Sequence, residues 1–210
     1  MYITLRRGMI ASGQVAATTF AVEMAELAEQ TTGNAVSVWG SVFGMPLGTI
    51  SWTSQVAGFA DAASQSQKLI ENPEWVSRIA QAGEQGLFIP GSLEDGMARI
   101  IHAAGDAGPM MYASTTMGTP APGMAMQALE WATQMTDHVA SATGNQVILC
   151  TSNYGNATGN MIFFMGFASA ESVDATQETL MSDSTYMEAM GKAAELFLPD
   201  GQRNLTQRLN

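Results

Sequence analysis

Few side chains in this sequence combine a reactive group with a place on a predicted strand. Arg6 could bind a substrate carboxylate or stabilise an enolate, because a guanidinium joins a fixed charge to several hydrogen-bond donors. His102 ends a predicted strand and could act as a general base, since imidazole titrates near neutral pH. Tyr2 and Tyr112 could donate hydrogen bonds to a ligand. We take Arg6, His102 and Tyr2 as the candidate catalytic residues.

Composition and charge exclude several classes of protein. The 210 residues are 46% hydrophobic and 13% charged, which excludes a disordered chain. Eight Lys and Arg against 19 Asp and Glu give a net charge of −11, so we expect neither nucleic acid nor a membrane as a partner. One cysteine and two histidines leave no thiolate or His-rich metal site, and we expect no metal and no cofactor. With no targeting segment found, we predict a cytoplasmic protein.

The chain repeats itself. Thr32-Gly33-Asn34 recurs as Thr143-Gly144-Asn145, and Leu87-Phe88-Ile89-Pro90 recurs as Leu196-Phe197-Leu198-Pro199. Other glycines and aromatic residues recur in the same order, at separations of 109 to 111 residues. We interpret residues 1–104 and 110–210 as two copies of one unit, joined by a short linker of Gly, Ala, Asp and Pro.

Each copy is predicted to form a strand, a helix, two strands, a helix and a strand. In the first copy, residues 2–6 alternate with period two, and Gly33 supplies the left-handed backbone that ends a helix. Residues 36–42 and 48–53 read as a hairpin, residues 58–85 are helical with a break at Asn72-Pro73, and residues 97–102 form a last strand. This order is the ferredoxin-like βαββαβ unit, so the predicted fold class is α+β.

The repeated unit resembles the dimeric α+β barrel superfamily, most nearly its NIPSNAP-like branch. The resemblance lies in Asn72-Pro73-Glu74-Trp75 and in residues 87–95, whereas the second copy departs from it because Asp183-Ser184-Thr185-Tyr186 has no proline. It implies that two ferredoxin-like units pack sheet to sheet, as an intramolecular α+β barrel around a cavity. The superfamily includes cofactor-independent monooxygenases, polyketide cyclases, isomerases and haem-binding enzymes, so the fold does not fix the function.

One side of each sheet is expected to line that cavity. We assign the apolar alternation of the first copy, which includes Ile3, Leu5, Val38 and Trp52, to the helices. The side chains predicted to bind substrate are Trp39, Ser51, Tyr112, Cys150 and Phe164, with Arg6 and Tyr2 on the same side. Hydroxyl groups mixed with apolar groups suit a mostly apolar or aromatic molecule with a few oxygens. The alternative is that the sheets interdigitate and leave no cavity.

The candidate residues also have structural explanations. Arg6 and His102 could reach water at strand ends, and the two tyrosines could only fill space. His138 reads as a hydrogen-bonded residue at the edge of the core, and a buried Cys150 without a basic neighbour stays protonated. We therefore predict a small-molecule protein of the α+β barrel type: a cofactor-independent monooxygenase, cyclase or isomerase. The alternatives are a non-catalytic binder of an apolar ligand and a structural protein that self-assembles into a homo-oligomer through exposed strand edges or helices.

Overall fold

The chain forms a mixed α+β structure made of two compact units. The computed structural model describes residues 1–155 and 159–210, which contain eight strands and six helices. Unit 1 comprises Met1–Ala98 together with Arg208–Asn210, and unit 2 comprises Arg99–Gln207. The boundary between the units falls within strand β4 (Glu94–Ala104), and the last three residues of the chain belong to unit 1.

Unit 1 is a set of antiparallel strands with three helices. Its elements are β1 (Tyr2–Met9), α1 (Gln14–Thr32), β2 (Val36–Phe43), β3 (Thr49–Val56), α2 (Phe59–Glu71), α3 (Pro73–Glu84) and the beginning of β4 (Glu94–Ala104). Strand β3 lies between β1 and β2 and pairs antiparallel with both. The hairpin predicted for residues 36–53 is therefore confirmed as β2 and β3.

Unit 2 repeats this order of elements. It contains the end of β4, then β5 (Tyr112–Gly118), α4 (Ala125–Thr143), β6 (Val147–Tyr154), β7 (Met161–Phe167), α5 (Ala170–Ser182), α6 (Ser184–Leu196) and β8 (Gln202–Arg208) up to Gln207. Its strands lie in the order β8-β5-β7-β6, and each pair is antiparallel.

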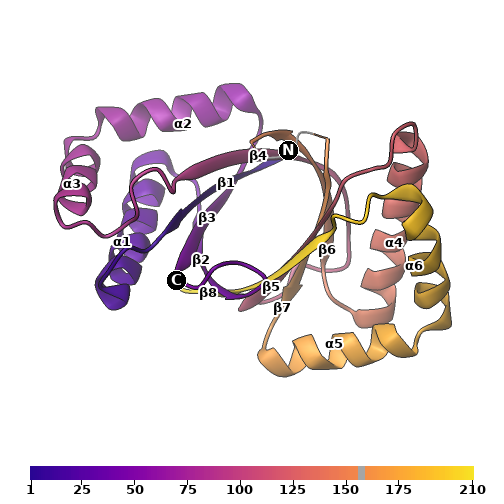
Figure 1. Cartoon of the computed structure of the whole chain (residues 1–210). Coiled ribbons are helices and arrows are strands. Elements are labelled where there is room, and N and C mark those ends of the chain that lie inside the picture. Colours follow the sequence, from indigo (N-terminus) through magenta and orange to yellow (C-terminus); the bar gives the residue numbers. More distant parts are fainter. Residues whose placement is uncertain (156–158) are drawn as a thin grey trace. The chain divides into compact units, whose positions relative to one another are not determined.

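One side of each sheet packs against a long helix (Figure 1). In unit 1, Val38 and Ile50 pack against Ala21 and Ala25 of α1, and the Trp52 indole donates a hydrogen bond to the Ala21 carbonyl. In unit 2, the side chains packed together are Leu149 and Met161 of the sheet and Ala128 and Ala132 of α4. Alanines spaced by four residues let both helices approach their strands closely. We call this side of each sheet the helix face and the opposite side the far face.

The helix boundaries follow from local sequence. Helix α1 ends at Gly33, whose φ of 79° is left-handed and whose N–H donates to the Glu29 carbonyl. The helical region after β3 breaks where the sequence predicts, because Asn72 caps α3 through the N–H groups of Glu74 and Trp75. Asp183 caps α6 in the same way. Among the described residues, none of the helices has the length and apolar character that crossing a membrane requires.

Leu149 tests this packing, because its side chain is fully buried between β6 and the two alanines of α4. Leu149→Ala removes the buried methyl groups and leaves a cavity, so we expect it to lower the free energy of unfolding by about 3 kcal/mol. Leu47→Ala, at a leucine that is 84% exposed, is the control and should change that free energy by less than about 0.5 kcal/mol. Urea denaturation measures both, and equal effects would contradict the packing.

Candidate functional site

The far face of unit 1 brings an indole, a hydroxyl and a guanidinium into one row. Ser51 lies directly opposite Trp39 on β2 and directly opposite Arg7 on β1. Directly opposed residues of antiparallel strands point to the same side of a sheet. Because Trp52 points to α1, its neighbour Ser51 points away from the helix, and so do Trp39 and Arg7.

Trp39 and Ser51 are enclosed rather than at the surface. Their exposed fractions are only 7% and 6%. The Trp39 indole N–H donates to Thr53 Oγ1 over 2.9 Å, which satisfies its polar edge and fixes the plane of the ring. A flat aromatic surface beside a buried hydroxyl is suited to stacking against an aromatic ligand that carries an oxygen.

Arg7, and not Arg6, is the β1 cation of this face. Arg6 lies opposite Trp52, so it is on the helix face, where both carboxylate oxygens of Asp95 accept its hydrogen bonds at 2.7 and 2.9 Å. Asp95 raises the pKa of the Arg6 guanidinium, chiefly through this hydrogen bonding. Arg7 Nε donates to Glu94 Oε2 over 2.7 Å. The prediction that Arg6 faces the cavity is therefore wrong, because the strand register places it on the helix face.

Both candidate tyrosines also lie on the helix face. Tyr2 is opposite Val56, which shares a side of β3 with Trp52. Tyr112 is opposite Phe167, which shares a side of β7 with Phe163, and Phe163 packs against α4. The predicted cavity positions of Tyr2 and Tyr112 are wrong for the same reason as that of Arg6. On β1 and β5 the two sides are therefore the reverse of the prediction. The residues predicted to face the cavity point toward the helices, and those predicted to face the helices point away from them.

The far face of unit 2 includes a group of apolar side chains on β6 and β7. Cys150 lies opposite Ile162, and Phe164 lies opposite Ile148, all pointing away from α4 as the alternation predicts. Burial without a nearby cation raises the pKa of the Cys150 thiol to about 12. Cys150 is therefore a protonated, apolar group at neutral pH and has no nucleophilic role.

The two histidines belong to the helix layer of unit 2. His102 Nε2 is 2.6 Å from Asp137 Oδ1 on α4, and His138 Nε2 is 2.7 Å from Asp183 Oδ2 at the start of α6. The Tyr186 N–H and His138 hold the pKa of the Asp183 carboxyl below its usual range. His102 is thus joined to a helix carboxylate on the side of the sheet that packs against α4, and we leave it out of the site. In the described residues, no three His, Cys, Asp or Glu side chains gather to form a metal site.

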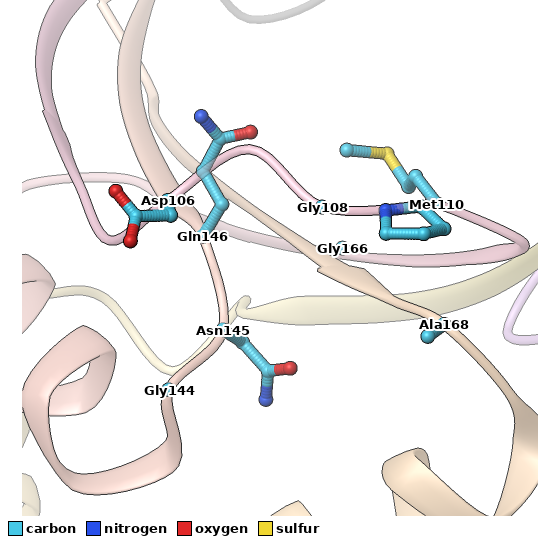
Figure 2. A pocket seen from close by; sticks show the side chains of 9 residues that line it. Asp106, Gly108, Met110, Gly144, Asn145, Gln146, Gly166 and Ala168 are labelled. Carbon is cyan, nitrogen blue, oxygen red and sulfur yellow. The ribbon is translucent and has the colours of Figure 1, made fainter.

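A small recess in unit 2 lies beside the linker (Figure 2). The residues that line it include Asp106, Gly108, Met110, Asn145 and Gly166. Its volume of about 150 Å³ is below the roughly 300 Å³ at which ligand pockets begin. Because of this small size, we assign it no function.

Comparison with solved structures shows that the chain shares its fold with α+β barrel proteins. It is similar to a protein named as a monooxygenase from Fusobacterium nucleatum, with a TM-score of 0.72 and 11% identity over 100% of this chain and 92% of that one. It is also similar to an anthrone oxidase-like protein, with a TM-score of 0.69 and 14% identity over 100% and 91%. A protein named as a monooxygenase from Lactobacillus acidophilus gives a TM-score of 0.66 and 11% identity over 100% and 94%.

These identities show the fold alone. No protein-family model matches the chain, and no curated protein matches it in sequence. The predicted α+β barrel fold is therefore confirmed.

The raised pKa of Cys150 predicts how its thiol reacts. In the folded protein at pH 8, we expect iodoacetamide to leave Cys150 unmodified, because the thiol is buried and its pKa is about 12. In high urea its pKa returns to about 8.5 and it should react fully. The folded state favours the protonated form of this thiol more strongly than the unfolded state does. The resulting contribution to stability is fully present below about pH 8.5 and is lost as the pH rises toward about 12. Mass spectrometry detects the adduct, and rapid labelling of folded protein would contradict the assignment.

Proposed function

We propose that the chain is a cofactor-independent oxygenase of the α+β barrel type, and that it binds an aromatic substrate on the far face of unit 1. The observation that carries the proposal is the row of Arg7, Ser51 and Trp39, which one strand register places together. The indole would stack on the ring system, while the hydroxyl and the guanidinium would meet its oxygens. The structural neighbours named as monooxygenases and as anthrone oxidase-like support this kind of chemistry.

The reaction we propose is the oxidation of a methylene group activated by an aromatic ketone. Loss of one C–H proton gives an enolate, whose negative charge a guanidinium and a hydroxyl stabilise. The electron-rich enolate itself reduces O₂. Overall, the methylene loses two hydrogens and gains one oxygen as a carbonyl, and the second oxygen leaves as water. Glu94, which accepts the Arg7 hydrogen bond, is the candidate base for the C–H proton.

We also infer that the two halves are duplicated ferredoxin-like units. Gly33 and Gly144 both end a helix with a left-handed φ and donate to the residue four positions earlier. Asn72 and Asp183 cap corresponding helices through two backbone N–H groups each. The closer likeness to the NIPSNAP-like branch rests on the sequence of residues 72–75 and 87–95.

The second candidate function is a non-catalytic binder of an apolar or aromatic molecule. It is favoured by the far face of unit 2, where Ile162, Cys150 and Phe164 offer apolar surface and no titratable group at neutral pH. Oxygen consumption separates the two functions, because binding alone uses none.

The adjacent residues Arg6 and Arg7 give a matched test of the oxygenase. With anthrone as the trial substrate, we expect the purified protein to consume one O₂ per anthrone oxidised. Arg7→Met should lower the rate about 100-fold, because it removes a donor to the enolate oxygen. Arg6→Met removes the same charge from the helix face and should leave the rate within about twofold, since its exposed pair with Asp95 contributes little.

An oxygen electrode and the absorbance of the quinone product measure these rates. Equal losses in the two variants would contradict the far-face site. Saturable binding of anthrone without oxygen uptake would instead support the non-catalytic binder.

A further inference from the structure

The last three residues of the chain form part of unit 1 and lie beside β2 (Figure 1). The Leu209 N–H donates to the Val38 carbonyl over 2.9 Å. The Asn210 side chain accepts from the Val38 N–H and donates to the Val36 carbonyl, over 2.9 and 2.8 Å. The C-terminal segment is thus held in a defined position against the strand that carries Trp39.

This anchoring fixes the direction of Arg208. Leu209 packs on the helix face, together with Val38 and Ala21. Successive side chains of an extended segment point to opposite sides. Arg208 therefore extends on the far face, the side on which Trp39, Ser51 and Arg7 lie.

Arg208 also carries an unsatisfied donor. Its Nε is buried and has no hydrogen-bond partner among residues 1–155 and 159–210. Within these ranges Arg6, Arg7 and Arg78 each pair with a carboxylate, whereas Arg208 forms no ion pair. A buried donor on a charged group is costly unless an acceptor meets it, and an oxyanion is the acceptor that a guanidinium binds best.

We propose that Arg208 is the anion-binding residue of the far-face site, and that the ligand is an aromatic molecule carrying an oxyanion such as a carboxylate, sulfonate or phenolate. The guanidinium would bind the oxyanion while the Trp39 indole packs against the ring. This proposal takes its location from the proposed function but does not depend on catalysis. To the proposed site it adds the chemical class of the ligand and a binding residue from the C-terminal end of the sequence.

Two fluorescent probes test the proposal. 8-Anilinonaphthalene-1-sulfonate and N-phenyl-1-naphthylamine share an aromatic skeleton, and only the first carries an anion. We expect the wild-type protein to bind the sulfonate more tightly than the neutral probe. Arg208→Met should raise the Kd of the sulfonate about tenfold or more, the value of a hydrogen bond to a charged group, and should leave the Kd of the neutral probe within about twofold.

Arg99→Met is the matched control. Arg99 is the residue that corresponds to Arg208 in the first half, and it is exposed. Its loss changes the net charge of −11 by the same amount, so it reports any general repulsion of the anion. We expect it to leave both Kd values within about twofold. Melting temperatures of the variants show whether each one is folded.

Several outcomes would overturn the proposal: no preference of the wild type for the sulfonate, equal weakening of both probes in Arg208→Met, or an equal effect in Arg99→Met. A variant that unfolds is replaced by Arg208→Lys, which keeps the charge but loses Nε and should weaken only the sulfonate. Unchanged sulfonate binding in that variant would likewise overturn the proposal. Selective loss of sulfonate binding in a protein that consumes no oxygen would support Arg208 while contradicting the oxygenase.

Discussion

The hydrogen bond from the Trp52 indole to the Ala21 carbonyl holds one side of β3 against α1, and the proposed site of unit 1 depends on which side this is. Once Trp52 points to the helix, the pleat directs Ser51 and Thr53 away from it. The strand register then adds Trp39 and Arg7 to the same side. A shift of one residue in the β1–β3 or the β2–β3 pairing would turn one of these side chains toward the helix, and the row would no longer exist.

The two units use the same elements to build different surfaces. The positions of Arg7, Trp39 and Ser51 in the first half correspond to Met117, Cys150 and Ile162 in the second, and those three residues also lie in register on a far face. Both units have a helix lined with alanines and similar helix caps, whereas the polar groups of this row occur only in unit 1. This asymmetry is the reason for assigning the chemistry to unit 1 and apolar packing to the row in unit 2.

Much of the fold could be predicted from local patterns, because Gly33, Asn72 and Pro73 act through nearby backbone groups. The directions of Val38, Trp52 and Leu149 could be predicted too, since their strands alternate clearly between apolar and polar residues. The same reasoning fails on β1, where Ile3 and Leu5 point away from the helix. The alternation on β1 therefore assigns Arg6 to the cavity, whereas the strand register assigns Arg7 to the far face. The role of Arg208 cannot be predicted from sequence, because its direction depends on a contact between the C-terminal residue and β2, which lie 172 residues apart.

The most direct test of the site at Trp39 is fluorine NMR of protein labelled with 5-fluorotryptophan. The chain has four tryptophans, and substitution of each by phenylalanine assigns its signal. When an aromatic anion such as 8-anilinonaphthalene-1-sulfonate is added, the account predicts a large saturable shift of the Trp39 signal and little change at Trp52, on the opposite side of the same sheet. A saturable shift at Trp52, Trp75 or Trp131 with Trp39 unmoved would contradict it.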